Sequence, residues 1–403
     1  MMQKLVIIGG GFAGMWSALV AAREAATANT PLAITVVAPD DHLTVRPRLY
    51  EPFTPAMRAP LRPLFGPLGI ELCLATVSAI DSTACTVDAR DAQGAAHSLP
   101  YDRLVLAAGS VQRALPVPGA SEHALDVDTY AGAEKLSAHL DRILAAPDSP
   151  ARLTFVVIGG GFSGIEVAAE LRHHLRRKGD EAAAKAARIV LVERESAVGP
   201  DLGAQPRPHI EAALAACNVE VRLATSVTAI EADAVTLSGG ERIPCATTII
   251  TTGLGAHPLA AGIGAEHDAQ GRVLVDGALH VRGTDKVFAA GDIARAEVDD
   301  SHVALMSCQH AVPMGKHAGY NAARELLGLP LREYRQPDYV TCLDLGDFGA
   351  ILTAGWDRAI TQVGAEVKGL KQMINTQWIY PPTGDRQALL VASDIDAPWP
   401  PEV

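Results

Sequence analysis

Two glycine-rich loops have the spacing that most directly indicates chemistry in this 403-residue chain. Each holds Gly-x-Gly-x-x-Gly after a short apolar run, at residues 5–8 and 155–158, and before an alanine-rich helical pattern. The first glycine permits a tight turn, the second lets a diphosphate approach the backbone, and the third allows close helix packing. The glycines are Gly9, Gly11, Gly14, Gly159, Gly161 and Gly164. Two copies in this context predict two dinucleotide sites.

An acidic residue follows the second loop at the end of the next predicted strand. Glu193 closes the β-branched run at residues 189–192, where a carboxylate can accept hydrogen bonds from an adenosine ribose. This carboxylate would repel a 2′-phosphate and so favours NADH. The guanidinium of Arg194 could accommodate that phosphate, so NADPH is an alternative. The corresponding position after the first loop is Ala38, so Asp40 or a backbone group must supply that contact.

Three later segments are typical of strands that end in small residues beside a nucleotide. They are Leu-Val-Leu-Ala-Ala-Gly-Ser at 104–110, Ile-Ile-Thr-Thr-Gly at 249–253, and Thr-Asp-Lys-Val-Phe-Ala-Ala-Gly-Asp-Ile at 284–293. Small side chains let the chain pass close to a cofactor, and an aspartate can accept a hydrogen bond from a sugar-alcohol chain. A plain turn is the alternative for the Gly-Asp pair. The residues singled out are Ala108, Gly109, Gly253, Gly291 and Asp292.

The elements that must position these residues occur twice, about 150 residues apart. In each copy a strand, a glycine loop and a helix are followed by another β-branched run, at 34–37 and 189–192. Short apolar strands alternating with helices predict parallel sheets covered on both faces. We therefore predict an α/β protein with two Rossmann-like dinucleotide-binding domains. A hairpin turning near residues 346–347 should begin a small α+β C-terminal domain.

Composition argues against several other classes of protein. The formal charge of −12, from 34 Lys+Arg against 46 Asp+Glu, repels polyanions, so no nucleic-acid partner is expected. The six cysteines are scattered without a Cys-x-x-Cys pair, so neither a metal site nor a redox-active dithiol is predicted. Because the sequence shows no signal-peptide layout and no run of roughly 20 apolar residues, we expect a cytoplasmic protein.

Taken in order, these motifs resemble the pyridine nucleotide-disulfide oxidoreductase superfamily, whose flavoproteins have two dinucleotide-binding domains. The match covers roughly residues 4–325. Three segments within it are similar to type II NADH dehydrogenases. They are His-Leu-Thr-Val-Arg-Pro-Arg-Leu-Tyr at 42–50, Gly-Gly-Gly-Phe-Ser-Gly-Ile-Glu at 159–166, and Gln309 followed by a small-residue helix.

The resemblance implies FAD and NADH as cofactors, with NADPH as an alternative to NADH. It places FAD in a discontinuous domain, 1–115 and 257–330, the nicotinamide cofactor in an inserted domain, 116–256, and a small domain at 331–403. FAD would be held by Gly9, Gly11, Gly14 and Asp292, and NADH by Gly159, Gly161, Gly164 and Glu193. The other predicted cofactor-binding residues are Ala13, Asp40, Arg46, Pro47, Ala108, Gly109, Gly253 and Gly291.

Glu166, Gln309 and His310 are the catalytic residues that this resemblance suggests. In the resembling enzymes a carboxylate at the position of Glu166 lies near the flavin, where it could position the ring or relay protons. A glutamate stabilised by the helix dipole is the plain alternative. Gln309 matches a position on the quinone side, beside a helix N-terminus that would face the flavin. His310 is a candidate proton donor, or else a structural histidine.

We therefore predict an enzyme that passes hydride from NADH to flavin and electrons to a quinone or quinone-like acceptor. Two alternatives share the cofactors: a soluble flavoenzyme acting on another small aromatic molecule, and an FAD- and NADH-binding redox sensor. Rapid NADH oxidation with soluble quinones would distinguish the predicted quinone-reducing enzyme from both alternatives.

The C-terminal segment leaves the partners open. Val367, Leu370, Ile374 and Trp378 share one face of a predicted helix, with Lys368, Lys371 and Asn375 elsewhere, and a polar tail runs from 383 to 403. This helix could contact the inner face of a membrane peripherally, pack on its own domain or form a homodimer.

Overall fold

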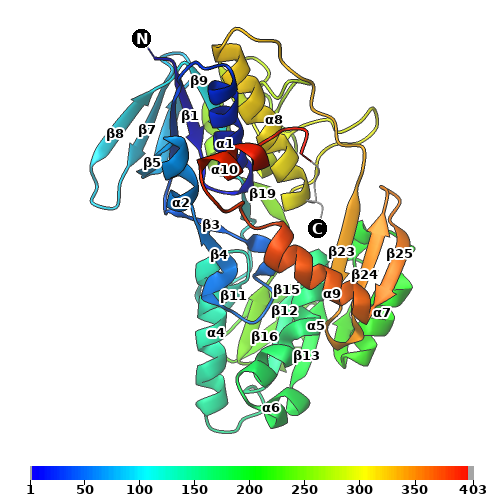
Figure 1. Ribbon diagram of the computed structural model, residues 1–403. Coiled ribbons are helices and arrows are strands. Elements are labelled where there is room, and N and C mark those ends of the chain that lie inside the picture. The colour runs from blue at the N-terminus through cyan, green and yellow to red at the C-terminus, as the bar shows by residue number, and fades with distance from the viewer. Residues whose placement is uncertain (1, 398–403) are drawn as a thin grey trace.

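The computed structural model describes residues 2–397, and its first sheet joins strands that are far apart in sequence. All neighbours in this five-stranded sheet run parallel. Helices α1 (Phe12–Thr27) and α8 (Cys308–Leu326) lie side by side against it (Figure 1). In order across the sheet, the strands are β21 (Val287–Ala289), β9 (Arg103–Leu106), β1 (Lys4–Ile8), β2 (Ala33–Ala38) and β5 (Glu71–Leu74).

The second sheet repeats this plan and contains the second glycine loop. Its neighbouring strands are also parallel, and its strands and helices occupy the lower half of Figure 1. The strands, in order, are β11 (Ala124–Asp126), β18 (Thr247–Ile250), β12 (Thr154–Ile158), β13 (Arg188–Val192) and β14 (Val219–Arg222). The helices are α4 (Tyr130–Ala145), α5 (Phe162–Arg177), α6 (Glu181–Ala186) and α7 (Arg207–Ala216). The predicted α/β class is confirmed.

Strand β12 shows why its run from Phe155 to Ile158 is unbroken in apolar residues. Phe155 and Val157 join one buried cluster, whereas Val156 and Ile158 join another. Successive side chains of a strand point to opposite faces, so a strand covered on both faces needs an unbroken apolar run.

Smaller elements cover and connect the two sheets. The antiparallel sheets are β6 (Thr76–Asp81), β7 (Thr86–Arg90) and β8 (Ala96–Pro100), and β15 (Val227–Ile230), β16 (Ala234–Leu237) and β17 (Arg242–Pro244). The two-stranded pairs are β10 (Ser110–Gln112) with β19 (Leu254–Ala256), β3 (His42–Thr44) with β4 (Arg58–Pro60), and β20 (Val273–Leu274) with β22 (Ala294–Arg295). Two one-turn helices complete this set, α2 (Arg62–Phe65) and α3 (Ala120–His123).

Helices α1 and α8 approach closely because glycines of α8 face the backbone of α1. A Cβ added at Gly315 would lie 2.4 Å from the carbonyl oxygen of Ala13, and one at Gly319 would lie 2.1 Å from that of Ser17. The Ser17 hydroxyl also donates to the Gly315 carbonyl at 2.9 Å. This contact fixes the N-terminus of α8 next to the first glycine loop.

We expect Gly315→Ala to lower the free energy of unfolding by about 1–3 kcal/mol, because backbone atoms would have to move apart. Chemical denaturation monitored by circular dichroism measures the loss. Gly369→Ala, in helix α9 (Ala365–Met373), is the matched control, since its added Cβ would meet no described atom outside its own helix within 4 Å. Equal stabilities for the two variants would contradict this account of the helix contact.

The C-terminal region contains an antiparallel sheet and a bent helix. The predicted hairpin is confirmed, with its turn at Gly346–Phe348. The elements are β23 (Val340–Asp344), β24 (Ala350–Ala354), β25 (Ala359–Gly364) and α9 (Ala365–Met373), which continues as a π-helical turn, Ile374–Trp378.

The predicted apolar face of this helix is buried only in part. Val367 is buried and Leu370, Ile374 and Trp378 are partly buried, whereas Lys371 and Asn375, which the spacing places off that face, are buried as well. The reason is that the inward face of α9 meets buried carboxylates of the protein, which attract an ammonium group.

The predicted polar tail is partly helical. Helix α10 (Arg386–Ala392) packs on α1, with Leu389 fully buried and Arg23 donating to the carbonyl of Leu390 at 3.1 Å. The last part of that tail, residues 398–403, lies outside the described residues. None of the helices within residues 2–397 has the length and apolar character needed to cross a membrane.

Candidate functional site

The two glycine loops have the same geometry. The N–H of Gly9 donates to the carbonyl of Val37, and that of Gly159 to the carbonyl of Val192, both at 2.9 Å. A Cβ at the third glycine, Gly14 or Gly164, would lie within 2 Å of a carbonyl oxygen of its own loop, at 1.9 and 1.8 Å. The first glycines, Gly9 and Gly159, have φ angles of +110° and +109°, and a Cβ there would lie 2.3 and 2.9 Å from a backbone carbonyl oxygen. The first and third glycines are therefore required by packing and backbone conformation, without any ligand.

The middle glycines differ, and they indicate a ligand. No described atom lies within 4 Å of a Cβ added at Gly11 or Gly161. Their φ angles of −74° and −77° are accessible to any residue. Folding therefore does not require glycine at either position, whereas a diphosphate lying against the helix N-terminus would. Both loops thus fit the diphosphate of a dinucleotide.

The acidic position differs between the two loops as the sequence predicts. Glu193 is buried, and its two carboxylate oxygens accept the N–H groups of Gly160, at 2.6 Å, and Glu195, at 2.9 Å. Its equivalent in the first copy is Ala38, since each follows the residue whose carbonyl accepts the loop N–H. Asp40 is exposed and accepts the N–H of His42 at 2.8 Å.

Asp292 lies in a polar cluster that joins segments distant in sequence. Its carboxylate accepts the Ser110 hydroxyl at 2.6 Å and lies 3.4 Å from Arg46. Arg46 also pairs with Asp128, which precedes α4. Burial raises the pKa of Asp292, while Arg46 and Ser110 oppose the rise. A carboxylate that is already engaged by a cation and a hydroxyl can accept a further hydrogen bond from a cofactor hydroxyl.

The remaining predicted cofactor residues lie around the same loops. Gly291, at φ +76°, would bring a Cβ within 2.9 Å of that of Ala13, so only glycine fits beside α1. Ala108 and Gly109 follow β9, and Gly253 follows β18. Pro47 lies in the short helical turn Arg46–Arg48, and its carbonyl accepts the Asn375 side chain at 3.3 Å.

Glu166 is buried in an ion pair that sequence reasoning did not find. Its Oε1 lies 3.0 Å from Nζ of Lys371, on α9, and accepts the backbone N–H of Asp344 at 3.1 Å. Burial raises the pKa of Glu166 to about 7, against the opposing effect of the Lys371 ammonium. The carboxyl can therefore gain or release a proton near neutral pH.

A second ion pair lies beside the first. Lys368, also on α9, pairs with Glu170 and with Asp344, and Tyr50 donates to Asp344 at 3.1 Å. The signal in the sequence was the spacing, because Glu166 and Glu170 are four apart on a helix and so share one face. The lysine partners lie on α9, far from α5 in the sequence, so their identity required the fold.

The two other predicted catalytic residues, Gln309 and His310, lie at the start of α8. Their side chains form hydrogen bonds with other residues of the protein. With its amide oriented to satisfy both atoms, the Gln309 side chain donates to the carbonyl of Val340 at 2.6 Å and accepts its N–H at 3.1 Å.

His310 is fully buried, and its Nδ1 lies 3.0 Å from the Ser307 hydroxyl. Burial lowers the pKa of His310 to about 4, so it is neutral near pH 7. Burial also raises the pKa of the neighbouring Cys308 thiol to about 11, so it is not a thiolate.

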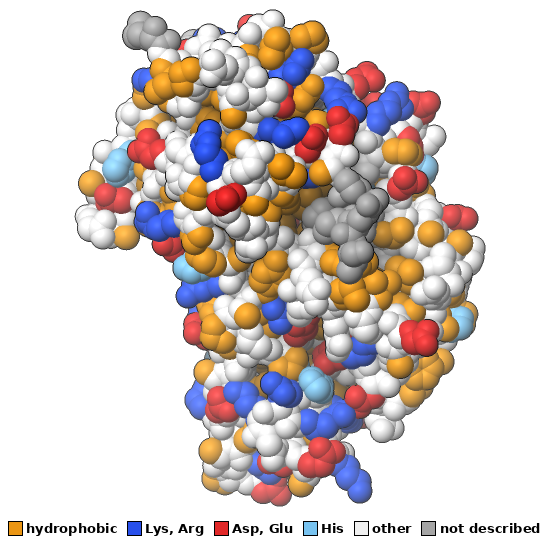
Figure 2. Space-filling model, in the orientation of Figure 1, with side chains coloured by type: hydrophobic (Ala, Val, Ile, Leu, Met, Phe, Trp, Pro, Cys, Tyr) orange, Lys and Arg blue, Asp and Glu red, His pale blue; other side chains and the backbone are white. Residues whose placement is uncertain are grey.

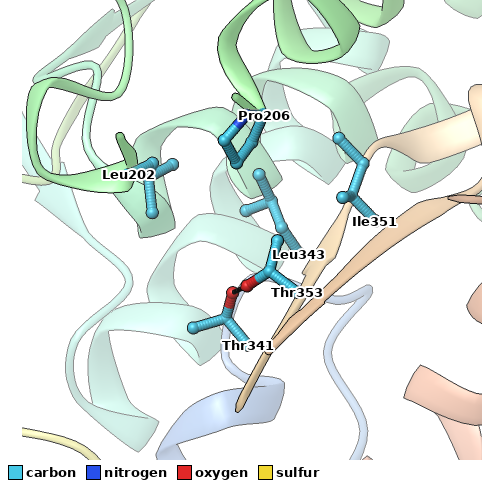
Figure 3. Close-up of a pocket in the computed structure, with 6 residues that line it drawn as sticks. All are labelled: Leu202, Pro206, Thr341, Leu343, Ile351 and Thr353. Carbon is cyan, nitrogen blue, oxygen red and sulfur yellow. Dashed lines mark hydrogen bonds between the residues drawn. The ribbon is translucent and has the colours of Figure 1, made fainter. Parts of the chain in front are cut away.

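A small apolar cavity lies apart from this site, between α7 and the C-terminal sheet (Figure 3). Its volume of about 10 Å³ is that of a single water molecule, and the hydroxyls of Thr341 and Thr353 on its wall hydrogen-bond to each other at 2.5 Å. It cannot hold a substrate. The residues that line it are Leu202, Pro206, Thr341, Leu343, Ile351 and Thr353.

Two parallel sheets with matching glycine loops define the class of protein: an α/β protein with two dinucleotide-binding folds. A family model described as pyridine nucleotide-disulphide oxidoreductase matches residues 3–315. An NADH dehydrogenase-like protein of Mycobacterium tuberculosis is 43% identical over 399 residues, covering 97% of this chain and 98% of the relative. A demethylphylloquinone reductase of Synechocystis is 31% identical over 362 residues, covering 87% and 86%.

Solved structures show the same fold. The NDH2 of Plasmodium falciparum superposes with a TM-score of 0.77 at 13% identity over 99% of both chains. The sulfide:quinone oxidoreductase of Aquifex aeolicus gives 0.77 at 18% identity, covering 98% of this chain and 93% of the other. The chain belongs to the pyridine nucleotide-disulphide oxidoreductase family, as its motifs predict, and it is an NAD(P)H oxidoreductase.

Proposed function

We propose that this protein is an FAD-dependent NADH oxidoreductase that reduces a quinone or quinone-like acceptor. The observation that carries the cofactor assignment is the open space at Gly11 and Gly161, each at a helix N-terminus, with the Glu193 carboxylate beside the second loop. The relatives described as a demethylphylloquinone reductase and as type II NADH:quinone oxidoreductases support the choice of acceptor.

Each cofactor has a distinct set of residues in this proposal. The loop of Gly11 and the N-terminus of α1 would bind the FAD diphosphate, and Asp292 would accept a hydroxyl of its sugar-alcohol chain. The loop of Gly161 would bind the NADH diphosphate, and Glu193 its adenosine ribose. We propose the domains accordingly, with FAD at 1–115 and 257–330, NADH at 116–256, and a small domain at 331–403. The pairing of β21 with β9 across the inserted segment supports this division.

FAD, when bound, accepts a hydride from the nicotinamide and passes two electrons to the acceptor. The protein's residues orient the two rings and handle protons. Glu166 can hold a proton at its carboxyl near neutral pH, and Lys371 holds a compensating positive charge at 3.0 Å. The N-terminus of α8 contributes a positive helix dipole at the side of the first loop.

The proposed function is tested on the purified protein. A flavin absorption spectrum, its bleaching by NADH without oxygen, and its return on adding a water-soluble quinone would support the proposal. Bleaching by NADH without return under quinone would contradict the acceptor. A protein that neither carries flavin nor takes up added FAD would contradict the proposal as a whole.

We expect Glu193→Ala to raise the Kd for NADH about 10-fold, because one charge-assisted hydrogen bond to the ribose is lost. Equilibrium titration followed by fluorescence measures the change. Glu195→Ala is the control, since Glu195 contributes only its backbone N–H to the Glu193 carboxylate. If both variants bind NADH like the wild type, Glu193 does not contact the ribose.

A further inference from the structure

Reduction of a quinone by NADH takes up one proton from solution in each turnover, because NADH, H⁺ and quinone give NAD⁺ and quinol. Glu166, the proton-holding residue of the proposed site, is only 4% exposed. We propose that Lys368, Asp344 and Tyr50 deliver this proton from solvent to Glu166. This inference rests on the proposed function and adds to it the route by which the site is reprotonated.

Lys368 is the member of the cluster that reaches solvent. Its side chain is 23% exposed, whereas those of Glu170 and Asp344 are 6% and 5% exposed. Its ammonium donates to Glu170, to Asp344 Oδ1 at 2.9 Å and to the carbonyl of Gly346 at 2.9 Å. One end of the route is therefore in contact with water and the other with a buried carboxylate.

Asp344 and Tyr50 extend the route toward Glu166. Asp344 Oδ2 accepts the Tyr50 hydroxyl at 3.1 Å, and the Asp344 backbone N–H donates to Glu166 at 3.1 Å, so one residue contacts both ends of this step. Nζ of Lys371 lies 5.6 Å from the centroid of the Tyr50 ring. Burial and the charge of Glu166 together raise the pKa of Tyr50, so its hydroxyl stays protonated and can pass a proton on.

The buried cluster of Glu166, Glu170, Asp344, Lys368 and Lys371 has more carboxyl than ammonium groups, which favours the binding of one more proton. Three carboxyls, of Glu166, Glu170 and Asp344, are balanced by only two ammonium groups, of Lys368 and Lys371. Burial and the nearby Asp344 raise the pKa of Glu170 to about 7. The other titratable groups that face the cluster are Tyr50, Glu51, His173, Cys308 and Cys342.

The proposed transfer moves one proton along the route and breaks or forms only bonds to hydrogen. Lys368 gives a proton to Asp344 and regains one from water. The Asp344 carboxyl then protonates the Tyr50 oxygen as the phenolic proton passes to Glu166, which requires the hydroxyl to turn away from Asp344. The net result is one proton moved from solvent to Glu166, with the three residues between them restored.

The test compares two replacements of Lys368 in the holoenzyme. Lys368→Arg keeps a positive charge for Glu170 and Asp344 but cannot release a proton, whereas Lys368→Met loses both properties. Lys178→Met is the matched control, because Lys178 is also 23% exposed and pairs with Asp141 at 2.7 Å at the end of α5. Stopped-flow absorbance gives the rate of flavin reduction by NADH and of its reoxidation by a water-soluble quinone, between about pH 6 and pH 9.

We expect both Lys368 variants to slow reoxidation about 10-fold or more at alkaline pH, with partial recovery at acid pH and a larger solvent deuterium isotope effect. Flavin reduction by NADH should be unchanged, and Lys178→Met should match the wild type. Tyr50→Phe removes only one hydroxyl and should show the same slow reoxidation. Infrared titration of the resting protein should show carboxyl absorption that titrates near pH 7, from Glu166 and Glu170, and that is smaller in Glu170→Gln.

Two outcomes would overturn the inference. Wild-type reoxidation by Lys368→Arg at every pH would show that Lys368 supplies only charge. Wild-type reoxidation by Tyr50→Phe at every pH would exclude the route through its hydroxyl. Both require that the wild type reduces quinone with NADH, and failure of that reaction would instead contradict the proposed function.

Discussion

Replacing Gly11 by valine is expected to abolish FAD binding and leave the fold intact. The added side chain would enter space that no described atom occupies, and valine can adopt the φ of −74° found there. The same space is where the FAD diphosphate would lie. We expect the affinity for FAD to fall by at least about 100-fold, roughly 3 kcal/mol. Absorbance of the purified protein and titration with added FAD measure the loss.

Gly161→Val is the matched variant in the second loop, and it should separate the two cofactors. Its geometry is the same, so it should fold and retain FAD but lose NADH binding. Gly14→Val is the opposite control, because its Cβ would lie 1.9 Å from the Gly9 carbonyl oxygen and should prevent folding. A Gly11→Val protein that still contains flavin would show that this loop does not bind FAD.

Replacing Lys371 by methionine is expected to destabilise the protein in a pH-dependent way. It removes the ammonium that lowers the pKa of Glu166, so this pKa should rise further above its present value of about 7. A carboxyl with a raised pKa in the folded state loses its stabilising contribution as pH rises from its ordinary value of 4.5 through its folded value. We expect a loss of about 3–5 kcal/mol at pH 8 and a much smaller one at pH 5, where Glu166 is protonated.

Urea denaturation of the two proteins at both pH values measures this difference. Lys178→Met again serves as the control, since removing one member of a partly exposed ion pair should cost less than about 1 kcal/mol at either pH. A loss for Lys371→Met that is equal at both pH values would show that Glu166 is not the group left uncompensated.

Much of the nucleotide-binding framework was predictable because its signals are local. Glycine spacing, the apolar run at residues 5–8 and the end of β21 each depend on neighbours within a few residues. The family resemblance followed from the same motifs, and the comparisons confirm it. The individual cofactor contacts stay predictions, although the structure places Arg46, Asp292 and Gly291 beside the first loop.

The C-terminal helix shows where local patterns fail. Its spacing puts Val367, Leu370, Ile374 and Trp378 on one apolar face, yet Lys371 and Asn375 are buried together with Val367. Hydrophobic periodicity assumes an apolar neighbour. Here the neighbour is the α5 face that carries Glu166 and Glu170, and the energy of pairing buried charges determines which side of the helix turns inward.

Acidic and basic side chains are interspersed on the face drawn in Figure 2, as a chain with a net charge of −12 and many ion pairs would suggest. The charges that matter most for the proposed chemistry are buried, apart from the partly exposed Lys368, and the net charge of the chain does not reveal them. They belong to three segments of the chain: the loop of Tyr50, helix α5, and the region from β23 to α9.

Local signals were enough to establish two dinucleotide folds in this chain, because turns, strand ends and helix starts depend on residues close to one another. The contact of Gln309 with Val340, and that of Glu166 with Lys371 across 205 positions of the chain, required the folded structure. Burial and charge pairing depend on which surfaces pack together, and no short segment contains that information.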